Sequence, residues 1–283
     1  MSRNKERTGA HNANVETPHA NLNTDNSGGF SFVVPTEFVE LPSQGRYYPE
    51  GHPLRGQDTI EIRHMTAKEE DILTSRTLLK KGVALDRVLQ NVIVDKRINA
   101  ESMLVGDRNA AIIAMRVSGY GPVYETKVRC PSCTTTQKYK FNLGNTSVYA
   151  GDDIDVLKIA NNDNGTFDVQ LPMTEMTVTF RLLTGYDEGI LINTVQKDRK
   201  RSDEKSVTRQ LENIIIAVDG DSSAQTKKFL VDNIPSMDSR HLRLAFKQAC
   251  PNVDLTQLFE CQECDFEQDM EVPLSADFFW PDR

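Results

Sequence analysis

Two short cysteine pairs constrain the fold of this chain more than any other feature. Cys130 and Cys133 stand in "RCPSC", and Cys261 and Cys264 stand in "ECQEC". A C-x-x-C turn can direct two thiolates at one point, and a tetrahedral Zn²⁺ takes four ligands at ~2.3 Å, so two such turns complete one site. We therefore expect both pairs to meet around one ion, which holds together the ends of the intervening segment.

The residues around each pair alternate in the manner of β-strands, as in a zinc ribbon. Residues 120–145 and 256–277 are predicted to form this split, zinc-ribbon-like module of four cysteines from two distant hairpins. Many ribbon turns carry Gly after the second cysteine, where the backbone is left-handed, but here the residues are Thr134 and Asp265. Asp tolerates that conformation, whereas β-branched Thr does so poorly. Because a site with four cysteine ligands is coordinatively full, we expect it to be structural rather than catalytic.

The four cysteines leave other interpretations open. Iron also binds sites of four cysteines, although zinc is favoured here. The cysteines can instead be two unlinked reduced pairs, two local disulfides or a degenerate site without metal. Four thiolates around Zn²⁺ carry net negative charge, which nearby cations can offset; these are Lys127, Arg129, Lys138 and Lys140. Cys250 lies outside the pairs and is expected to be a small buried apolar residue.

The composition excludes several classes of protein. The chain has 283 residues, a formal net charge of −8 and a pI of about 5.3. Binding to nucleic acid or anionic lipid requires an excess of Lys and Arg, so the acidic balance argues against both partners. No segment approaches the ~18 consecutive apolar residues of a membrane span. The N-terminus also lacks the apolar core of a secretory signal.

The hydrophobic patterns indicate an α+β fold with an N-terminal β segment and a helical region. Residues 1–29 are too polar to bury a core and are predicted to be a disordered tail. Residues 30–119 form the next unit, with strands expected at 30–34 and 59–65. Its helices are expected at 65–82, 84–94 and 108–119. The expected helix ends are a capping box of Thr66 and Glu69, a stop at Gly82, a cap at Asp107 and an end at Gly119.

Residues 146–255 are predicted to be an inserted subdomain between the two cysteine hairpins. A hairpin is expected over residues 165–185, followed by three or four helices. These helices are expected at 186–201, 206–220, 223–234 and 236–249, with Asp187 and Ser236 as caps. The longest apolar runs of the chain, residues 110–115 and 214–218, are both predicted to be buried helical segments.

The C-terminal residues 278–283, "FFWPDR", form an aromatic tail with two open interpretations. Phe278, Phe279 and Trp280 either pack back on the core of the chain or dock into a neighbouring subunit, since aromatic side chains dominate interface anchors. No Gly-rich phosphate loop, nucleophile elbow or H-E-x-x-H motif is present, and the carboxylates are scattered. We therefore expect no enzymatic activity and assign no catalytic residue.

Residues 38–95 hold a spaced set of short motifs. They are Leu41-Pro42-Ser43, Gly45, Tyr48-Pro49, Met65-Thr66-Ala67 followed by the acidic Glu69-Glu70-Asp71, and "LLKKG". At this spacing they resemble the T-even-like bacteriophage baseplate protein family, described as baseplate hub subunit or hub assembly protein of contractile-tailed phages. The paired cysteines agree with longer members of that family.

The resemblance implies a structural or assembly protein of a contractile phage tail baseplate, either a hub subunit or a hub assembly chaperone. It implies contacts with other baseplate and tail proteins, no small-molecule substrate, and a location in the virion tail or in the host cytoplasm during assembly. Two rival hypotheses are a zinc-ribbon nucleic-acid or transcription adaptor, and an enzyme. The net charge of −8 speaks against the first. A deep pocket with converging carboxylates between ribbon and insertion would support the second.

Overall fold

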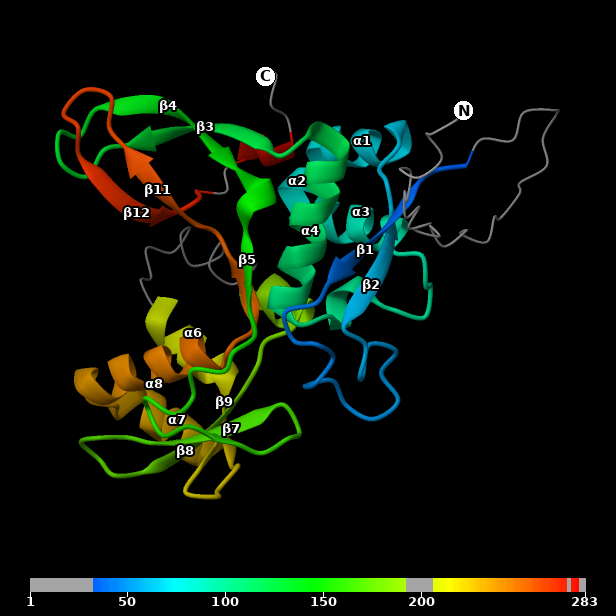
Figure 1. The fold of residues 1–283 in the computed structure, drawn as a ribbon. Helices are drawn as coiled ribbons and strands as arrows, with labels where there is room; N and C mark the ends of the chain where they lie inside the picture. The colour runs from blue at the N-terminus through cyan, green and yellow to red at the C-terminus, as the bar shows by residue number, and fades with distance from the viewer. Residues whose placement is uncertain (1–32, 192–205, 274–275, 280–283) are drawn as a thin grey trace, which may run out of the picture.

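The N-terminal part of the chain begins with a two-stranded sheet. The computed structural model describes residues 33–191, 206–273 and 276–279 (Figure 1). β1 (Thr36–Glu40) pairs antiparallel with β2 (Thr59–Arg63), as expected. Residues 33–35 are not in a strand, and β1 begins only after Pro35, which has no N–H to donate. Residues 30–32 of the strand predicted over 30–34 lie outside the described residues. The predicted tail lies outside the described residues.

Helices follow this sheet up to residue 120. They are α1 (Ala67–Thr74), α2 (Arg76–Lys81), α3 (Ala84–Val92), the 3₁₀ turn η1 (Ala100–Ser102) and α4 (Val105–Tyr120). The helix predicted over 65–82 is two helices, since Ser75 has an extended backbone between them. The Glu69 carboxylate accepts from the Thr66 N–H at 2.9 Å, as the capping-box prediction requires. Gly82 ends α2 in the left-handed conformation, which confirms the predicted stop.

Asp107 is not the helix cap that the sequence suggested. α4 begins two residues earlier, and Asp107 lies fully buried in its first turn. Its carboxylate accepts from the Ser43 N–H at 2.9 Å, the Ser43 hydroxyl at 2.6 Å and the Tyr48 hydroxyl at 2.7 Å. Asp107 therefore fixes the β1–β2 connection to α4. The helix also runs past Gly119 and ends at Tyr120, before Gly121.

One cysteine hairpin follows α4, and the other lies near the C-terminus. Each hairpin has a short strand beside it in the sequence. The first hairpin is β3 (Val123–Arg129) and β4 (Thr136–Asn142); the second is β11 (Thr256–Glu260) and β12 (Glu267–Glu271). Between them, the 3₁₀ turn η2 (Leu143–Asn145) leads into β5 (Ser147–Tyr149), which pairs antiparallel with β10 (Asn252–Asp254). Backbone hydrogen bonds therefore join the chain where the predicted insertion begins and ends, in addition to any metal.

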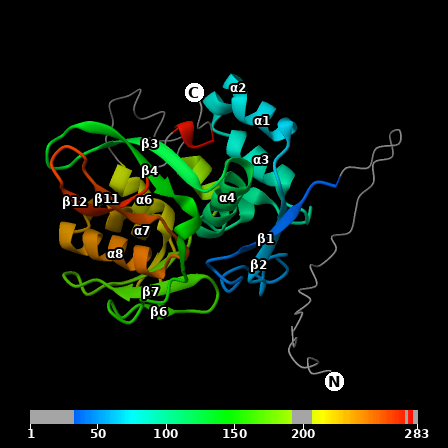
Figure 2. The same ribbon diagram turned by 45° about the horizontal axis from the view of Figure 1, so that its top comes forward.

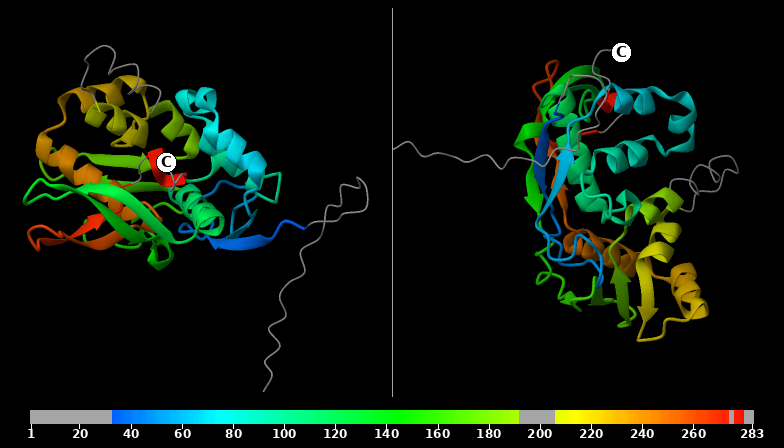
Figure 3. Two further views of the ribbon diagram at one scale, coloured as in Figure 1. Left: turned by 90° about the horizontal axis from the view of Figure 1, so that it is seen from above. Right: turned by 90° about the vertical axis from the view of Figure 1, so that its right-hand side faces the viewer.

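The segment between β5 and β10 builds a four-stranded sheet with its own helices. The sheet has the order β6 (Ala160–Asn161), β7 (Thr166–Gln170), β8 (Thr177–Arg181) and β9 (Ile215–Val218). The helices are α6 (Ser206–Ile214), α7 (Ala224–Asn233) and α8 (Ser236–Ala249). Figure 3 shows helices α1–α3 and α6–α7 on one side of the molecule and the hairpins β1–β2 and β3–β4 on the other.

The apolar run 214–218 is mostly a strand and not the predicted helical segment, since only Ile214 belongs to helix α6 and residues 215–218 form β9. Its β-branched isoleucines favour an extended backbone. β9 pairs with β8, and Ile215 and Val218 are buried against that sheet. The helical prediction failed because a short apolar run has no periodicity that separates a buried helix from a buried strand.

The caps predicted for the insertion also differ from those observed. Asp187 lies three residues beyond Thr184, and its carboxylate accepts from the Thr184 N–H at 2.9 Å. The chain is helical from residue 185 to residue 191, and the rest of the helix predicted over 186–201 lies outside the described residues. Ser236 is the first residue of α8, preceded by Pro235, and no side chain caps that helix. Ser223 caps α7 instead, accepting from the Thr226 N–H.

The C-terminal aromatic residues that the structure describes pack on the core of their own chain. Phe278 and Phe279 are buried in the 3₁₀ turn η3 (Ala276–Phe279), which lies beside β3 (Figure 2). The fully buried Arg116 of α4 donates to the Phe278 carbonyl at 2.6 Å. The Tyr124 ring meets the Phe278 ring edge-on, with centroids 5.3 Å apart. These two phenylalanines are therefore not surface anchors, and Trp280 lies outside the described residues.

Candidate metal centre

The two cysteine turns have the same backbone hydrogen bonds. In the first, the Thr134 N–H donates to the Cys130 carbonyl at 3.0 Å, and in the second the Asp265 N–H donates to the Cys261 carbonyl at 3.1 Å. The N–H of the first cysteine in each turn also donates, at 2.9 Å, to a carbonyl five residues later. The sequence repeat is thus a structural repeat, with both turns directing their sulfurs in the same way.

Each turn closes through one residue in the left-handed conformation. Thr134 has a φ of 61° and Asp265 a φ of 53°, at the positions where Gly was missing from the sequence pattern. Asp adopts this conformation at little cost, while a β-branched side chain is strained there. The first turn therefore carries strain that the second lacks.

All four predicted ligands meet at one point. The sulfur atoms of Cys130, Cys133, Cys261 and Cys264 lie within 4.8 Å of one another. Cys130 faces Cys264 with 3.8 Å between sulfurs, and Cys133 faces Cys261 with 3.7 Å. All five cysteines of the chain are free thiols, which excludes the two local disulfides in this structure. The prediction that the distant pairs form one cluster is confirmed.

Cys133 and Cys264 have pKa values that are shifted in opposite directions. Hydrogen bonds from the side chain and the backbone of Thr135 lower the pKa of Cys133 to about 6. The backbone N–H of Phe266 acts to lower the pKa of Cys264, but desolvation and the neighbouring thiols outweigh it and raise that pKa to about 12. Sulfurs this close repel as thiolates, so full ionisation of the cluster requires a cation among them.

Two glutamine side chains join the hairpins independently of the sulfurs. Gln137 of β4 donates to the Glu260 carbonyl at 3.2 Å and accepts from the Gln262 N–H at 3.1 Å. Gln257 of β11 makes the reciprocal pair, donating to the Asn142 carbonyl at 2.9 Å and accepting from the Asn142 N–H at 3.0 Å. Each side-chain amide thus donates to one backbone carbonyl and accepts from one backbone N–H of the other hairpin. Neither glutamine is predicted from the sequence, because nothing local distinguishes them from solvent-exposed glutamines.

An aromatic cluster supports the hairpins beneath the sulfurs. The Tyr139 ring lies 5.0 Å from the Phe259 ring and 4.9 Å from the Phe141 ring, centroid to centroid. The Tyr139 hydroxyl donates to the Leu258 carbonyl at 3.1 Å. Phe141 and Phe259 are fully buried, so this packing places the two turns next to each other through apolar contacts as well.

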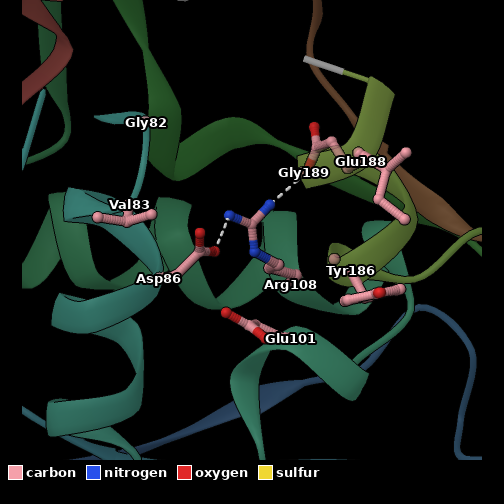
Figure 4. Close-up of a pocket in the computed structure, with 10 residues that line it drawn as sticks. Gly82, Val83, Asp86, Glu101, Arg108, Tyr186, Glu188 and Gly189 are labelled. Carbon is pink, nitrogen blue, oxygen red and sulfur yellow. Dashed lines mark hydrogen bonds and ion pairs between the residues drawn. The ribbon is translucent and has the colours of Figure 1, made fainter. Parts of the chain in front are cut away.

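A small pocket lies away from the cysteines, between α3, α4 and the segment after β8. Its volume is about 190 Å³, and Arg108 crosses it to form ion pairs with Asp86 and Glu188 (Figure 4). Small-molecule sites usually measure about 300–1,000 Å³. The pocket also lies outside the region between ribbon and insertion where the enzyme hypothesis placed an active site, so it gives that hypothesis no support.

Cys250 lies apart from the cluster, as expected. It follows α8, is partly buried, and burial raises the pKa of its thiol to about 11. The protonated thiol therefore behaves as a small apolar side chain at the end of that helix.

Comparisons with known proteins gave one match. A family model described as T4 bacteriophage base plate protein matches residues 34–280, which include the N-terminal sheet, both cysteine hairpins and the segment between them. No curated protein and no solved structure shows a significant match to the chain. Among the described residues, no helix is long and apolar enough to cross a bilayer.

Proposed function

Because the chain belongs to the T4 bacteriophage base plate protein family, we propose that it serves the hub of a contractile phage tail, as a hub subunit or as a hub assembly chaperone. The match over residues 34–280 carries this proposal. The chain acts through contacts with other baseplate and tail proteins, in the virion tail or in the host cytoplasm during assembly. A protein with this role needs no reaction centre, in agreement with the lack of catalytic motifs.

The four cysteines suit a structural Zn²⁺ ion. Sulfurs bound to zinc at ~2.3 Å in a tetrahedron lie about 3.8 Å apart. The two closest pairs between the turns measure 3.8 Å and 3.7 Å. Four thiolates are soft ligands that fill the coordination sphere, so the ion would brace the two hairpins as a zinc ribbon and offer no position to a substrate.

The metal proposal is tested by elemental analysis of the purified protein. We expect about one zinc per chain in the wild type and loss of zinc in both Cys130→Ser and Cys261→Ser, because each removes a ligand from a different turn. Cys250→Ser is the matched control and should keep its zinc. Equal zinc content in all four proteins would refute the joined site, and iron in place of zinc would refute the choice of ion.

The baseplate role is tested on phage particles. Mass spectrometry of purified virions separates its two forms, since a hub subunit is present in mature particles and an assembly chaperone is absent. In either case, we expect a knockout of the gene to yield particles without a functional tail hub. Normal, infectious tails from the knockout would reject both forms of the proposal.

A further inference from the structure

The two hairpins of the split module carry opposite charges on their exposed faces. The first exposes Lys127, Arg129, Lys138 and Lys140 beside a single carboxylate, Glu125. Residues 256–272 of the second contain no Lys or Arg. They expose six carboxylates, which are Glu260, Glu263, Asp265, Glu267, Asp269 and Glu271. We call these surfaces the basic face and the acidic face.

These faces point away from each other. Successive side chains of a strand point to opposite sides, and the inner sides of the hairpins pack together through Tyr139 and Phe259. The charged side chains of the strands occupy the alternate positions, on the outer side of each hairpin, while Glu263 and Asp265 lie in the turn between β11 and β12. Figure 1 shows the two hairpins as neighbouring layers, so the basic and acidic faces lie on opposite sides of one module.

Each face contains a repulsive contact that the chain itself relieves at most in part. Lys127 stands directly opposite Lys138 in the first hairpin, and Glu260 stands directly opposite Glu267 in the second. Like charges in such cross-strand pairs destabilise a sheet. Glu125 offsets part of the basic face through its 3.0 Å ion pair with Lys138. Among the described residues, no ion pair joins one hairpin to the other, so both faces lack a matching counter-charge.

We propose that the basic face of one chain binds the acidic face of a second copy of the same chain. A single module carries both complementary surfaces, and each repulsive pair would gain opposite charges across the contact. The faces point in opposite directions, so each copy contacts two neighbours head to tail, in a ring or an open chain. Val123 and Leu258, each 54% exposed, lie on the two faces and are covered by the contact.

Charge reversal tests this contact in the full-length protein. The first variant has two acidic faces and carries Lys127→Glu, Lys138→Glu and Lys140→Glu. The second variant has two basic faces and carries Glu267→Lys, Asp269→Lys and Glu271→Lys. Sedimentation velocity at about 50 mM salt should show wild-type species larger than a dimer, which dissociate at about 500 mM salt because ions screen the faces. Each variant alone should associate at least tenfold more weakly. An equimolar mixture of the two variants should associate again, since opposite faces then meet.

A matched control reverses three exposed cations on the insertion. Lys228→Glu/Arg240→Glu/Lys247→Glu changes the net charge as the first variant does and should associate like the wild type. Circular dichroism checks that each variant is folded. If the triple lysine variant unfolds, the double variant Lys138→Gln/Lys140→Gln is used in its place. Each of three results would overturn the proposal. The wild type stays monomeric at low salt, a face variant associates like the wild type, or the mixture fails to associate. Salt-sensitive DNA binding by a monomeric wild type would overturn it in favour of a nucleic-acid adaptor.

Discussion

Three buried charged residues show how single side chains fix the N-terminal half of the molecule. Asp107 accepts three hydrogen bonds from Ser43 and Tyr48, and burial raises the pKa of its carboxyl above the usual range. Arg116 donates to three backbone carbonyls, and burial lowers the pKa of its guanidinium. Glu69 instead faces a cation, Arg63, at 2.8 Å. These three buried side chains therefore have hydrogen-bond partners, as burial requires.

Glu69 makes the stability of the protein depend on pH. Burial acts to raise its pKa, but hydrogen bonds from Arg63 and Thr66 outweigh it and lower the pKa from 4.5 to about 2. The stabilisation is therefore fully present above pH 4.5 and is lost as the pH falls towards 2. A tenfold change in the acid dissociation constant corresponds to about 1.4 kcal/mol, so the contribution is about 3.5 kcal/mol at most. Glu69→Gln should lower the free energy of unfolding by up to that amount at pH 7.

Denaturant unfolding of both proteins at several pH values measures this effect. The difference between wild type and Glu69→Gln should shrink as the pH falls from 4.5 towards 2. Glu70→Gln changes the exposed neighbouring carboxylate and should alter the free energy of unfolding by less than about 0.5 kcal/mol. A difference that stays constant with pH would show that the charge of Glu69 contributes nothing.

Helix α4 (Val105–Tyr120) is the element that joins the separate parts of the chain. Asp107 binds the β1–β2 connection, Arg108 binds Glu188 of the insertion, and Arg116 binds the C-terminal turn η3. At Gly106, a Cβ atom would lie 1.9 Å from the carbonyl oxygen of Pro251, the residue that immediately precedes β10. Only glycine therefore lets α4 approach the strand that leads back to the second cysteine hairpin.

Gly106→Ala should separate α4 from β10. The added methyl group meets backbone atoms that cannot move aside, so we expect the free energy of unfolding to fall by about 1–3 kcal/mol or more. Gly189→Ala is a matched change in another helical segment, where a Cβ meets nothing within 4 Å. That control should be neutral or stabilising by up to about 1 kcal/mol. Thermal or denaturant unfolding compares the two, and equal stabilities would contradict the close approach.

At the scale of the whole molecule, the contacts around the cluster do not all depend on a metal. The β5–β10 ladder, the two glutamine pairs and the Tyr139–Phe259 contact connect the same regions without the sulfurs. The N-terminal core around α3 lies in a different part of the molecule (Figure 1). We infer that an ion would fix the cysteine turns rather than the entire fold.

Metal removal should therefore loosen the molecule locally. After chelation, hydrogen–deuterium exchange should increase in the two turns, residues 130–135 and 261–266, because their thiols repel once the ion is lost. Exchange in α3 (Ala84–Val92) should stay unchanged. Faster exchange throughout α3 would contradict local loosening, and unchanged exchange in both turns would contradict a bound metal.

Several features could be predicted from the sequence because local patterns determine them. The C-x-x-C turns between alternating strands predicted both hairpins, and their spacing from each other did not matter, since one tetrahedral ion takes all four ligands at one point. The amphipathic helix α3 and the stop at Gly82 also followed from neighbouring residues. The resemblance of residues 38–95 to a baseplate family agreed with the match over residues 34–280.

Other features depend on residues that are far apart in the sequence and were decided only by tertiary structure. Asp107 looked like a cap because the sequence does not show that Ser43 and Tyr48 reach it. Residues 215–218 are a strand because they pair with β8, and Gln137 and Gln257 are bridges because the other hairpin lies within reach. Local patterns determine which hydrogen-bonding and apolar groups are available, but the packing of distant segments decides which of them meet.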